Sequence, residues 1–328
     1  MPTDAPRDGA LPLVACVVGP TASGKSEVAD LVASRLSSSV VSVDAMQVYR
    51  GMDIGTAKVP SGLRHAPLEM VDVVDVGEEY SVARFQAEAR GVCDRLVSSG
   101  RVPVLCGGSG LYLDAVIDEM DFPSGSPASP SRLRYEAELE RLGPHGLWEE
   151  LRSRDPQSAA LVHEHNARRV IRALELLDEG SSYALRSEGL RRRAPHYQAR
   201  IWALVPDRER LYARIDARVD QMVSSGLVEE VRGLCQRGLR DSLTSMQAIG
   251  YKEVVAFLDG SCDLPEAVRR MKSNTRRYAK RQLSWMRRDG RAVELDVDEL
   301  GVQGCADLIS SRLGHATGGD GHVALRSS

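Results

Sequence analysis

The stretch Gly19-Pro-Thr-Ala-Ser-Gly-Lys25-Ser26 constrains the fold of this chain more than any other feature. It matches G-x-x-x-x-G-K-[ST], follows the all-apolar run Leu13–Val18 and opens a segment of helical periodicity. In this pattern the backbone N–H groups converge on a phosphate, and the helix N-terminus adds its positive end. Lys25 supplies a point charge, and the Ser26 hydroxyl suits Mg²⁺. The pattern predicts a diphosphate or triphosphate site made by Gly19, Pro20, Thr21, Ala22, Ser23, Gly24, Lys25 and Ser26.

The segments that follow indicate a parallel sheet. Short apolar strands are predicted at 40–43 and 102–106, with an amphipathic helix at 82–98 between them. Strands that alternate with helices over short connections are typical of a parallel α/β sheet.

A helical block interrupts this pattern. Residues 121–131 form a linker rich in Pro, Gly and Ser, and the chain from 131 to about 199 carries helical signals only. A strand at 201–205 and helical segments at 207–224, 227–236, 246–258 and 265–288 follow.

The predicted fold class is α/β, with a parallel-sheet core like that of P-loop NTPases and an inserted all-helical domain. The predicted parts are a flexible tail at 1–10, a core at 11–120 and 200–312, the inserted domain at 121–199 and a disordered tail at 313–328.

Composition excludes several classes of protein. The 328 residues are 42% hydrophobic and 27% charged, which supports a packed core and argues against wholesale disorder. The chain has no run of 18 apolar residues and no secretory signal at its N-terminus, so we expect a cytoplasmic protein without membrane contact. Six cysteines without a C-x-x-C pair favour reduced thiols over a zinc site or disulfides. The oligomeric state is left open, with a monomer as the default.

Lysine is rare in this chain. Only five of the 43 basic residues are lysine, namely Lys25, Lys58, Lys252, Lys272 and Lys280. Such a lysine is either a chance survivor of a compositional habit or marks a position that needs a compact ammonium in place of a forked guanidinium.

The phosphate loop alone favours a nucleotide kinase or NTPase. These enzymes usually hold Mg²⁺ with an acidic residue at the end of a neighbouring strand. Asp44, directly after the predicted strand 40–43, fits that position, and Asp72 and Asp75 are weaker candidates.

Longer motifs point elsewhere. Asp44-Ala-Met-Gln47-Val-Tyr49 and Asp53-Ile-Gly-Thr-Ala-Lys58 follow the phosphate loop, and further motifs run along the chain: Tyr80-Ser-Val-Ala-Arg-Phe85, Gly107-Gly-Ser-Gly-Leu-Tyr112, Arg169-Val-Ile-Arg172-Ala-Leu-Glu175, Gly250-Tyr-Lys252-Glu and Thr275 to Arg287. In this order, over about residues 12–290, they resemble the tRNA dimethylallyltransferase (isopentenyltransferase) family.

The resemblance implies a reaction and its substrates. The exocyclic amine of the adenosine 3′-adjacent to the anticodon attacks dimethylallyl diphosphate, and diphosphate leaves with the help of Mg²⁺ bound at Ser26. Asp44 is the candidate base for the weakly nucleophilic amine. Ser109, where the family usually has threonine, is the second catalytic candidate, and Arg218 resembles the arginine that clasps the diphosphate.

The resemblance also implies contacts with the tRNA anticodon stem–loop, to which basic residues of the inserted block and of the stretch 269–291 would contribute. Solvated surface is the competing interpretation of these arginines. The candidate contacts are Asp44, Ala45, Met46, Gln47, Arg132, Arg168, Arg169, Arg172, Lys252, Lys280, Arg281, Gln282, Trp285 and Arg287.

Three departures from the family pattern concern only fine contacts to RNA. Ala45 replaces a frequent serine, His65 stands alone where a histidine pair is common, and Asn166 replaces an aspartate. Two other functions stay open at this point: an ATP-dependent small-molecule or nucleotide kinase, and a non-catalytic RNA-binding P-loop protein.

Overall fold

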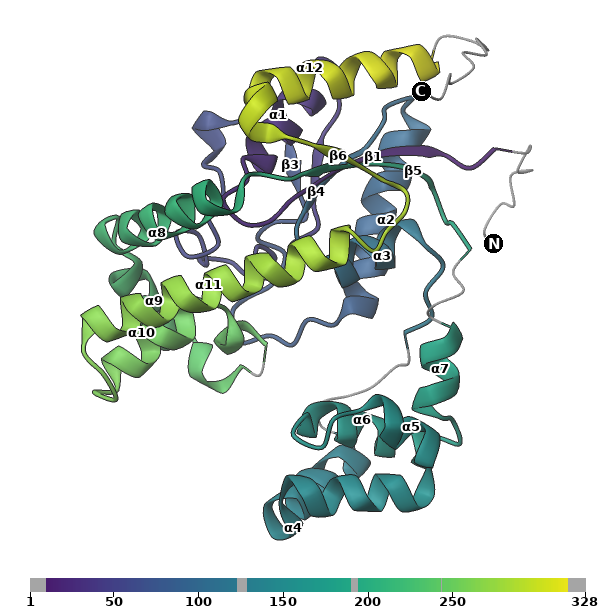
Figure 1. Ribbon diagram of the computed structural model, residues 1–328, viewed down its shortest axis with the longest axis vertical. Helices are drawn as coiled ribbons and strands as arrows, with labels where there is room; N and C mark the ends of the chain where they lie inside the picture. Colours follow the sequence, from purple (N-terminus) through teal and green to yellow (C-terminus); the bar gives the residue numbers. More distant parts are fainter. Residues whose placement is uncertain (1–9, 123–128, 190–193, 243, 318–328) are drawn as a thin grey trace. The chain divides into compact units, whose positions relative to one another are not determined.

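The computed structural model describes residues 10–122, 129–189, 194–242 and 244–317. The chain divides into two compact units, Met1–Ile117 with Pro195–Ser328, and Asp118–Ala194. The first unit carries the sheet and the second is helical (Figure 1). No helix in the described part of the chain is long and apolar enough to cross a membrane.

A six-stranded parallel sheet forms the first unit, in the order β3-β2-β4-β1-β5-β6. The strands are β1 (Leu13–Val18), β2 (Val40–Ser42), β3 (Leu68–Glu69), β4 (Val104–Gly107), β5 (Gln198–Leu204) and β6 (Ala292–Leu295). The strand β1 is central, with Cys16 opposite both Leu105 and Ile201, and its alternate residues pack into a core on each face of the sheet, which explains its apolar run. The loop that follows β1 therefore lies at the middle of the sheet's carboxyl edge.

Helices cover both faces of the sheet (Figure 1). Ala15 and Val17 of β1 pack with α1 (Lys25–Arg35) and α12 (Val297–Thr317), which lie side by side on one face. The alternating residues Val14, Cys16 and Val18 pack into the core of the other face. That face carries α2 (Val82–Ser98), α3 (Gly110–Ile117), α9 (Leu227–Cys235), α10 (Tyr251–Leu258) and α11 (Leu264–Met286).

One further helix, α8 (Arg208–Ser224), packs beside α11 and is capped by Asp207. Short 3₁₀ turns lie at Ser61–Leu63, Leu239–Asp241 and Ser245–Gln247.

The second unit has four helices in its described part: α4 (Pro130–Arg154, kinked at Gly143), α5 (Pro156–Leu161), α6 (Ala167–Asp178) and α7 (Tyr183–Gly189). Tyr135, Leu147, Leu151 and Leu174 form its own buried core. An inserted helical block in an α/β protein, the predicted fold class, is confirmed.

Several element boundaries differ from the sequence prediction. Residues 195–199, predicted as helical, belong to the sheet unit, in which Gln198 pairs with Leu13. The exposed side chain of Gln198 gives no apolar strand signal in the sequence. The predicted helix 246–258 is divided at Gly250, where φ is 99°. The strand β6 was not predicted, since two of its four residues are exposed.

The predicted disordered tail at 313–328 begins too early. The helix α12 continues to Thr317, because Ile309 and Leu313 are buried against the sheet. Residues 318–328 and the predicted tail 1–10, apart from Ala10, lie outside the described residues.

The sheet core gives a stability prediction. Leu105 of β4 is fully buried, whereas Leu63 is 69% exposed. Replacing Leu105 by alanine removes packing and leaves a cavity, so we expect a loss of about 2–5 kcal/mol of unfolding free energy. The matched Leu63→Ala variant should change it by less than about 0.5 kcal/mol. Urea unfolding followed by circular dichroism measures both, and equal midpoints would contradict the assigned core.

Candidate active site

The phosphate loop, residues 19–26, joins β1 to α1. Ala22 and Gly24 have positive φ values of 62° and 84°, so the chain turns sharply before the helix begins. Gly24 occupies the N-cap position of α1 and offers no capping side chain. The first N–H groups of the helix therefore remain available to an anion.

Ser23 is a buried polar residue of this loop that suits an anion. Its side chain is 2% exposed, and its Oγ has no hydrogen-bond partner among the described residues. A Cβ on Gly19 would lie 2.5 Å from this Oγ, so glycine is needed there. Buried hydroxyls are normally bonded, which makes a phosphate oxygen a suitable partner for Ser23.

Two half-buried cations lie near one carboxylate. Loss of hydration lowers the pKa of Lys25, and the nearby Arg218 of α8 lowers it further, whereas Cys106 and Asp44 raise it. Loss of hydration also lowers the pKa of Arg218, and Asp44 raises it. The neighbouring acids Asp216 and Asp220 pair with Arg276 and Lys272 of α11, both at 2.7 Å. Arg218 is therefore directed to the site rather than paired along its own helix.

Asp44 directly follows Val43 at the end of β2. Its Oδ1 accepts a hydrogen bond from the N–H of Met46 at 2.8 Å, which fixes the turn. The charge of Asp44 also contributes to raising the pKa of Tyr112 and Tyr278, after the larger effect of burial. One carboxylate thus faces groups from α1, α3, α8 and α11.

The helix α11 is bonded to the phosphate loop. Gln282 accepts a hydrogen bond from the N–H of Thr21 at 2.9 Å and donates one to the carbonyl of Gly108 at 3.1 Å. A Cβ on Gly108 would lie 2.1 Å from Gln282 Nε2, and one on Gly110 would lie 2.3 Å from the Trp285 ring. The glycines after β4 are therefore required for the close approach of α11.

These elements surround a cavity of about 490 Å³. Of the predicted site residues, those that line it are Thr21, Lys25, Ser26, Asp44, Ala45, Met46, Gln47, Ser109, Arg218, Lys252, Arg281 and Gln282. Arg277, one of the basic residues of the stretch 269–291, also lines it, and sequence reasoning missed Arg64, Gln247, Asn274 and Tyr278 as site residues. Asn274, Tyr278, Arg281 and Gln282 are spaced by three or four residues, so they share one face of a helix. This spacing could have indicated that the face of α11 with these residues lines the site.

Other predicted residues lie away from this cavity. Trp285 is half-buried and packs over Gly110, so its contact with RNA stays a prediction. Lys280 is exposed on α11, and Arg287 is exposed directly after the helix ends. In the helical unit Arg168 and Arg169 are exposed, whereas Arg132 and Arg172 pair with Glu175 at 3.9 and 3.3 Å. Arg132 and Arg172 therefore hold that unit together.

The donor set limits what metal the site could hold. No group of three or more His, Cys, Asp or Glu suited to a metal is present in the described parts of the chain. The Ser26 hydroxyl lines the cavity near Asp44. Such a set fits Mg²⁺, which binds through few protein oxygens and mainly through substrate phosphates and water.

Comparison with known proteins identifies the family. A family model described as IPP transferase matches residues 47–289. The chain belongs to the IPP transferase family. A tRNA dimethylallyltransferase of Heliobacterium modesticaldum is 42% identical, with 94% of this chain and 96% of that protein covered. The enzyme of that name from Clavibacter sepedonicus is 45% identical over 87% of this chain and 93% of its own.

Solved structures of the IPP transferase family share the fold. A tRNA Δ(2)-isopentenylpyrophosphate transferase of Staphylococcus epidermidis has a TM-score of 0.69 and 34% identity, over 93% of this chain and 99% of that one. A eukaryotic dimethylallyltransferase acting on tRNA has a TM-score of 0.77 and 26% identity, over 93% and 80%. The predicted family is confirmed, this IPP transferase is an enzyme, and the kinase alternative is not favoured.

The lowered pKa of Lys25 gives a pH prediction. Diphosphate needs the charged ammonium, so the affinity for dimethylallyl diphosphate should fall as pH rises through the lowered pKa. The bound anion favours the charged form, so binding above that pKa should take up a proton. Calorimetry in two buffers of different ionisation enthalpy measures this uptake. The Lys25→Met variant controls for titration of the ligand, and an uptake equal to that of the variant would contradict the assignment.

Proposed function

We propose that the protein is a tRNA dimethylallyltransferase, which transfers the dimethylallyl group from dimethylallyl diphosphate to the exocyclic amine of the adenosine 3′-adjacent to the anticodon and releases diphosphate. The observation that carries the proposal is one cavity with residues of the phosphate loop, the Arg218 guanidinium and the Asp44 carboxylate on its wall. Relatives that match almost the whole chain have this name. A cytoplasmic monomer acting on the anticodon stem–loop fits the proposal.

The phosphate side of the cavity suits the leaving group. As the carbon–oxygen bond breaks, negative charge develops on the diphosphate, where Lys25, Arg218 and the N–H groups of the loop stabilise it. Mg²⁺, held by Ser26 and diphosphate oxygens, would neutralise part of the same charge. Preorganised cations stabilise the transition state more than the bound substrate, because the diphosphate gains negative charge only as its bond to the allylic carbon breaks.

The Asp44 side suits the nucleophile. The lone pair of an adenine amine is delocalised into the ring, so the amine is a poor nucleophile. As its nitrogen forms the bond to the allylic carbon, the Asp44 carboxylate takes one proton from it. Ser109, whose Oγ lies 3.5 Å from the Tyr278 hydroxyl, would orient the amine or a diphosphate oxygen. The target base must leave the loop stack to reach this depth.

The charges on α11 indicate which of its cations meet RNA. Arg269 and Arg270 pair with Glu266, and Lys272 and Arg276 pair with acids of α8. Arg277, Lys280 and Arg281 have no acidic partner among the described residues, although Arg281 lies 5.6 Å from the Tyr278 ring. Of these, Arg277 and Arg281 line the cavity, and we propose them as phosphate contacts together with Arg168 and Arg169 of the helical unit.

Label transfer tests the proposal. Wild-type protein with radiolabelled dimethylallyl diphosphate and unmodified tRNA should label the RNA, and the absence of label together with phosphate transfer from ATP would support a kinase instead. Asp44→Asn and Asp44→Ala should lower turnover by about 10²–10⁴-fold, because the general base is lost. The control Asp75→Asn alters an exposed carboxylate outside the cavity and should keep turnover. Asp44 variants that match this control would exclude Asp44 as the base.

The assignment on α11 predicts a salt effect. Loss of each phosphate contact should reduce the slope of log K against log salt by about 0.7–0.9. Arg277→Ala with Arg281→Ala should therefore flatten the slope for tRNA binding by about one to two units. The matched pair Arg269→Ala with Arg270→Ala, on the same helix but paired with Glu266, should leave it unchanged. Equal slopes for both double variants would contradict the distinction.

A further inference from the structure

One wall of the cavity is built by a segment without regular structure. Gly55, Thr56, Ala57 and Val59 line the cavity, but Lys58, in the same segment, does not. The wall consists of short side chains and backbone, so its shape depends on what holds the backbone. Two charged side chains that lie outside the cavity hold it.

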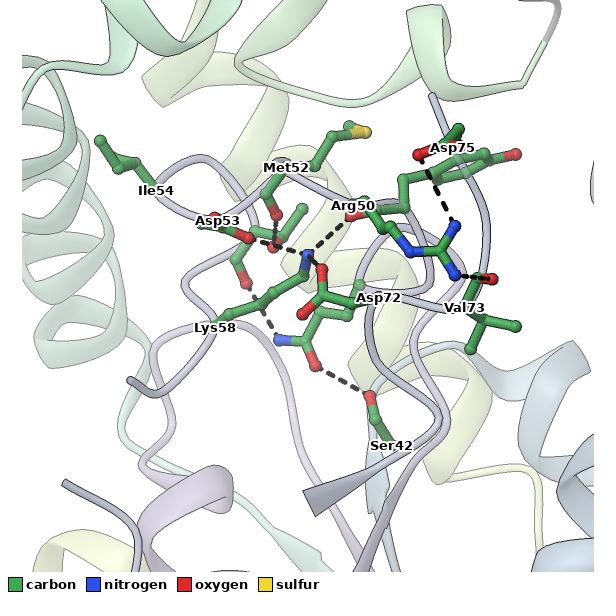
Figure 2. Close-up of polar contacts among 12 residues, drawn as sticks. Ser42, Arg50, Met52, Asp53, Ile54, Lys58, Asp72, Val73 and Asp75 are labelled. Atoms are coloured by element: carbon green, nitrogen blue, oxygen red, sulfur yellow. Dashed lines mark hydrogen bonds and ion pairs between the residues drawn. The ribbon is translucent and has the colours of Figure 1, made fainter. Parts of the chain in front are cut away.

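The first is Lys58, whose side chain is only 5% exposed. Its Nζ donates to the carbonyl of Tyr49 at 2.6 Å, to Asp53 Oδ1 at 2.9 Å and to Asp72 Oδ1 at 2.5 Å. In Figure 2 the ammonium of Lys58 lies between Asp53 and Asp72. An ammonium has three donors, and all three are used here. Lys58 thus ties its own segment to two others that are separate in sequence.

The segment held by Lys58 reaches Asp44 through Gln47. The Nε2 of Gln47 donates to the carbonyl of Thr56 at 3.1 Å, and its Oε1 accepts from the Ser42 hydroxyl at 2.8 Å. Ser42 ends β2, two residues before Asp44. The wall, Gln47 and the start of the Asp44 turn are therefore one hydrogen-bonded unit.

The second side chain is Glu230 of α9. Its carboxylate accepts hydrogen bonds from the N–H groups of Asp53, Ile54 and Gly55 at 3.1, 2.7 and 3.3 Å. It also accepts one from the Tyr251 hydroxyl at 2.6 Å. A Cβ on Gly55 would lie 2.4 Å from the Tyr251 ring, so the segment passes close against α10. The carboxylate binds three converging N–H groups, as anions do in other backbone concavities.

We propose that Lys58 and Glu230 are positioning residues, which fix the wall at 55–57 and Gln47 in the geometry that presents the target adenine to Asp44. The inference rests on the proposed function, since it assigns the wall to the RNA base. Neither residue touches the phosphate loop. Their loss should therefore affect the RNA substrate and leave the diphosphate site intact.

The acceptors around Lys58 explain why this arginine-rich chain keeps a lysine there. Three oxygens from different segments converge on one nitrogen, an arrangement that a planar guanidinium cannot satisfy with one nitrogen atom. Arginine would retain the charge but would be too large for this buried position. The variant Lys58→Arg therefore tests whether the geometry of the three hydrogen bonds matters when the positive charge is kept.

A variant without Lys58 should still fold. Asp53 and Asp72 are 57% and 46% exposed, so water can solvate both carboxylates when the ammonium is removed. The Tyr49 carbonyl retains a hydrogen bond from the N–H of Met52. The expected effect is a displaced wall rather than an unfolded protein.

The experiment measures both substrates on full-length protein. The variants are Lys58→Met, Lys58→Arg and Glu230→Gln, and the control is Arg50→Met. Arg50 is on the neighbouring loop, 47% exposed, and contacts the Val73 carbonyl and Asp75 outside the cavity (Figure 2). Label transfer gives kcat and KM for an anticodon stem–loop RNA, and calorimetry gives the affinity and stoichiometry for dimethylallyl diphosphate.

We expect the three variants to lower kcat/KM for the RNA by about 10–100-fold, the effect of a displacement of about 1 Å at a reacting group. Their affinity and stoichiometry for dimethylallyl diphosphate should match those of wild type and of Arg50→Met. Wild-type kinetics in Lys58→Met, or full activity in Lys58→Arg, would overturn the inference. It would also be overturned if diphosphate stoichiometry fell in parallel with activity, which indicates unfolding. Wild-type protein that transfers no label would instead refute the proposed function.

Discussion

The structure depends on the placement of positive charge at the carboxyl edge of the central strand. Lys25 and Arg218 are half-buried there, and the carboxylate of Asp44, which acts on both, carries one negative charge against their two positive charges. Loss of hydration is tolerable when an anion restores the balance, so the site is arranged to receive a diphosphate. The orphan hydroxyl of Ser23 and the available N–H groups of α1 serve the same anion. The charges, the available hydrogen-bond donors and the position after the central strand therefore all indicate a diphosphate ligand.

The second requirement is the close approach of α11 to the sheet. Gln282 bridges the phosphate loop and the turn after β4, and Gly108 and Gly110 have no Cβ that would keep the helix away. This contact brings Tyr278 and Arg281 to a cavity whose other wall begins more than 200 residues earlier in the chain. A single helix thus helps to form the phosphate loop's surroundings and also supplies the cations that we assign to RNA.

The opposing wall is organised by ion pairs and hydrogen bonds rather than by apolar packing. Lys58 and Glu230 satisfy backbone groups of a segment that has no helix or strand to fix it. Such a wall suits the planar base that we propose for it, because its short side chains leave room and the fixed backbone sets the shape of the surface. In the helical unit, ion pairs also distinguish the arginines. Arg132 and Arg172 pair with Glu175 within the unit, whereas Arg168 and Arg169 are exposed.

The sequence by itself determined the phosphate loop, Asp44, the parallel sheet, the inserted helices and the family, because each of these leaves a local pattern of spacing or a contiguous motif. It could not separate Arg281 from Arg276, since the acid that neutralises Arg276 is on α8, 60 residues away. It proposed Trp285 as an RNA contact but did not show that the ring packs on Gly110. Lys58 was distinguished by the rarity of lysine and by its place in the motif Asp53–Lys58, neither of which indicated its role, and Glu230 by nothing. Their roles depend on acceptors and donors from distant segments, which only the folded chain brings within hydrogen-bond distance.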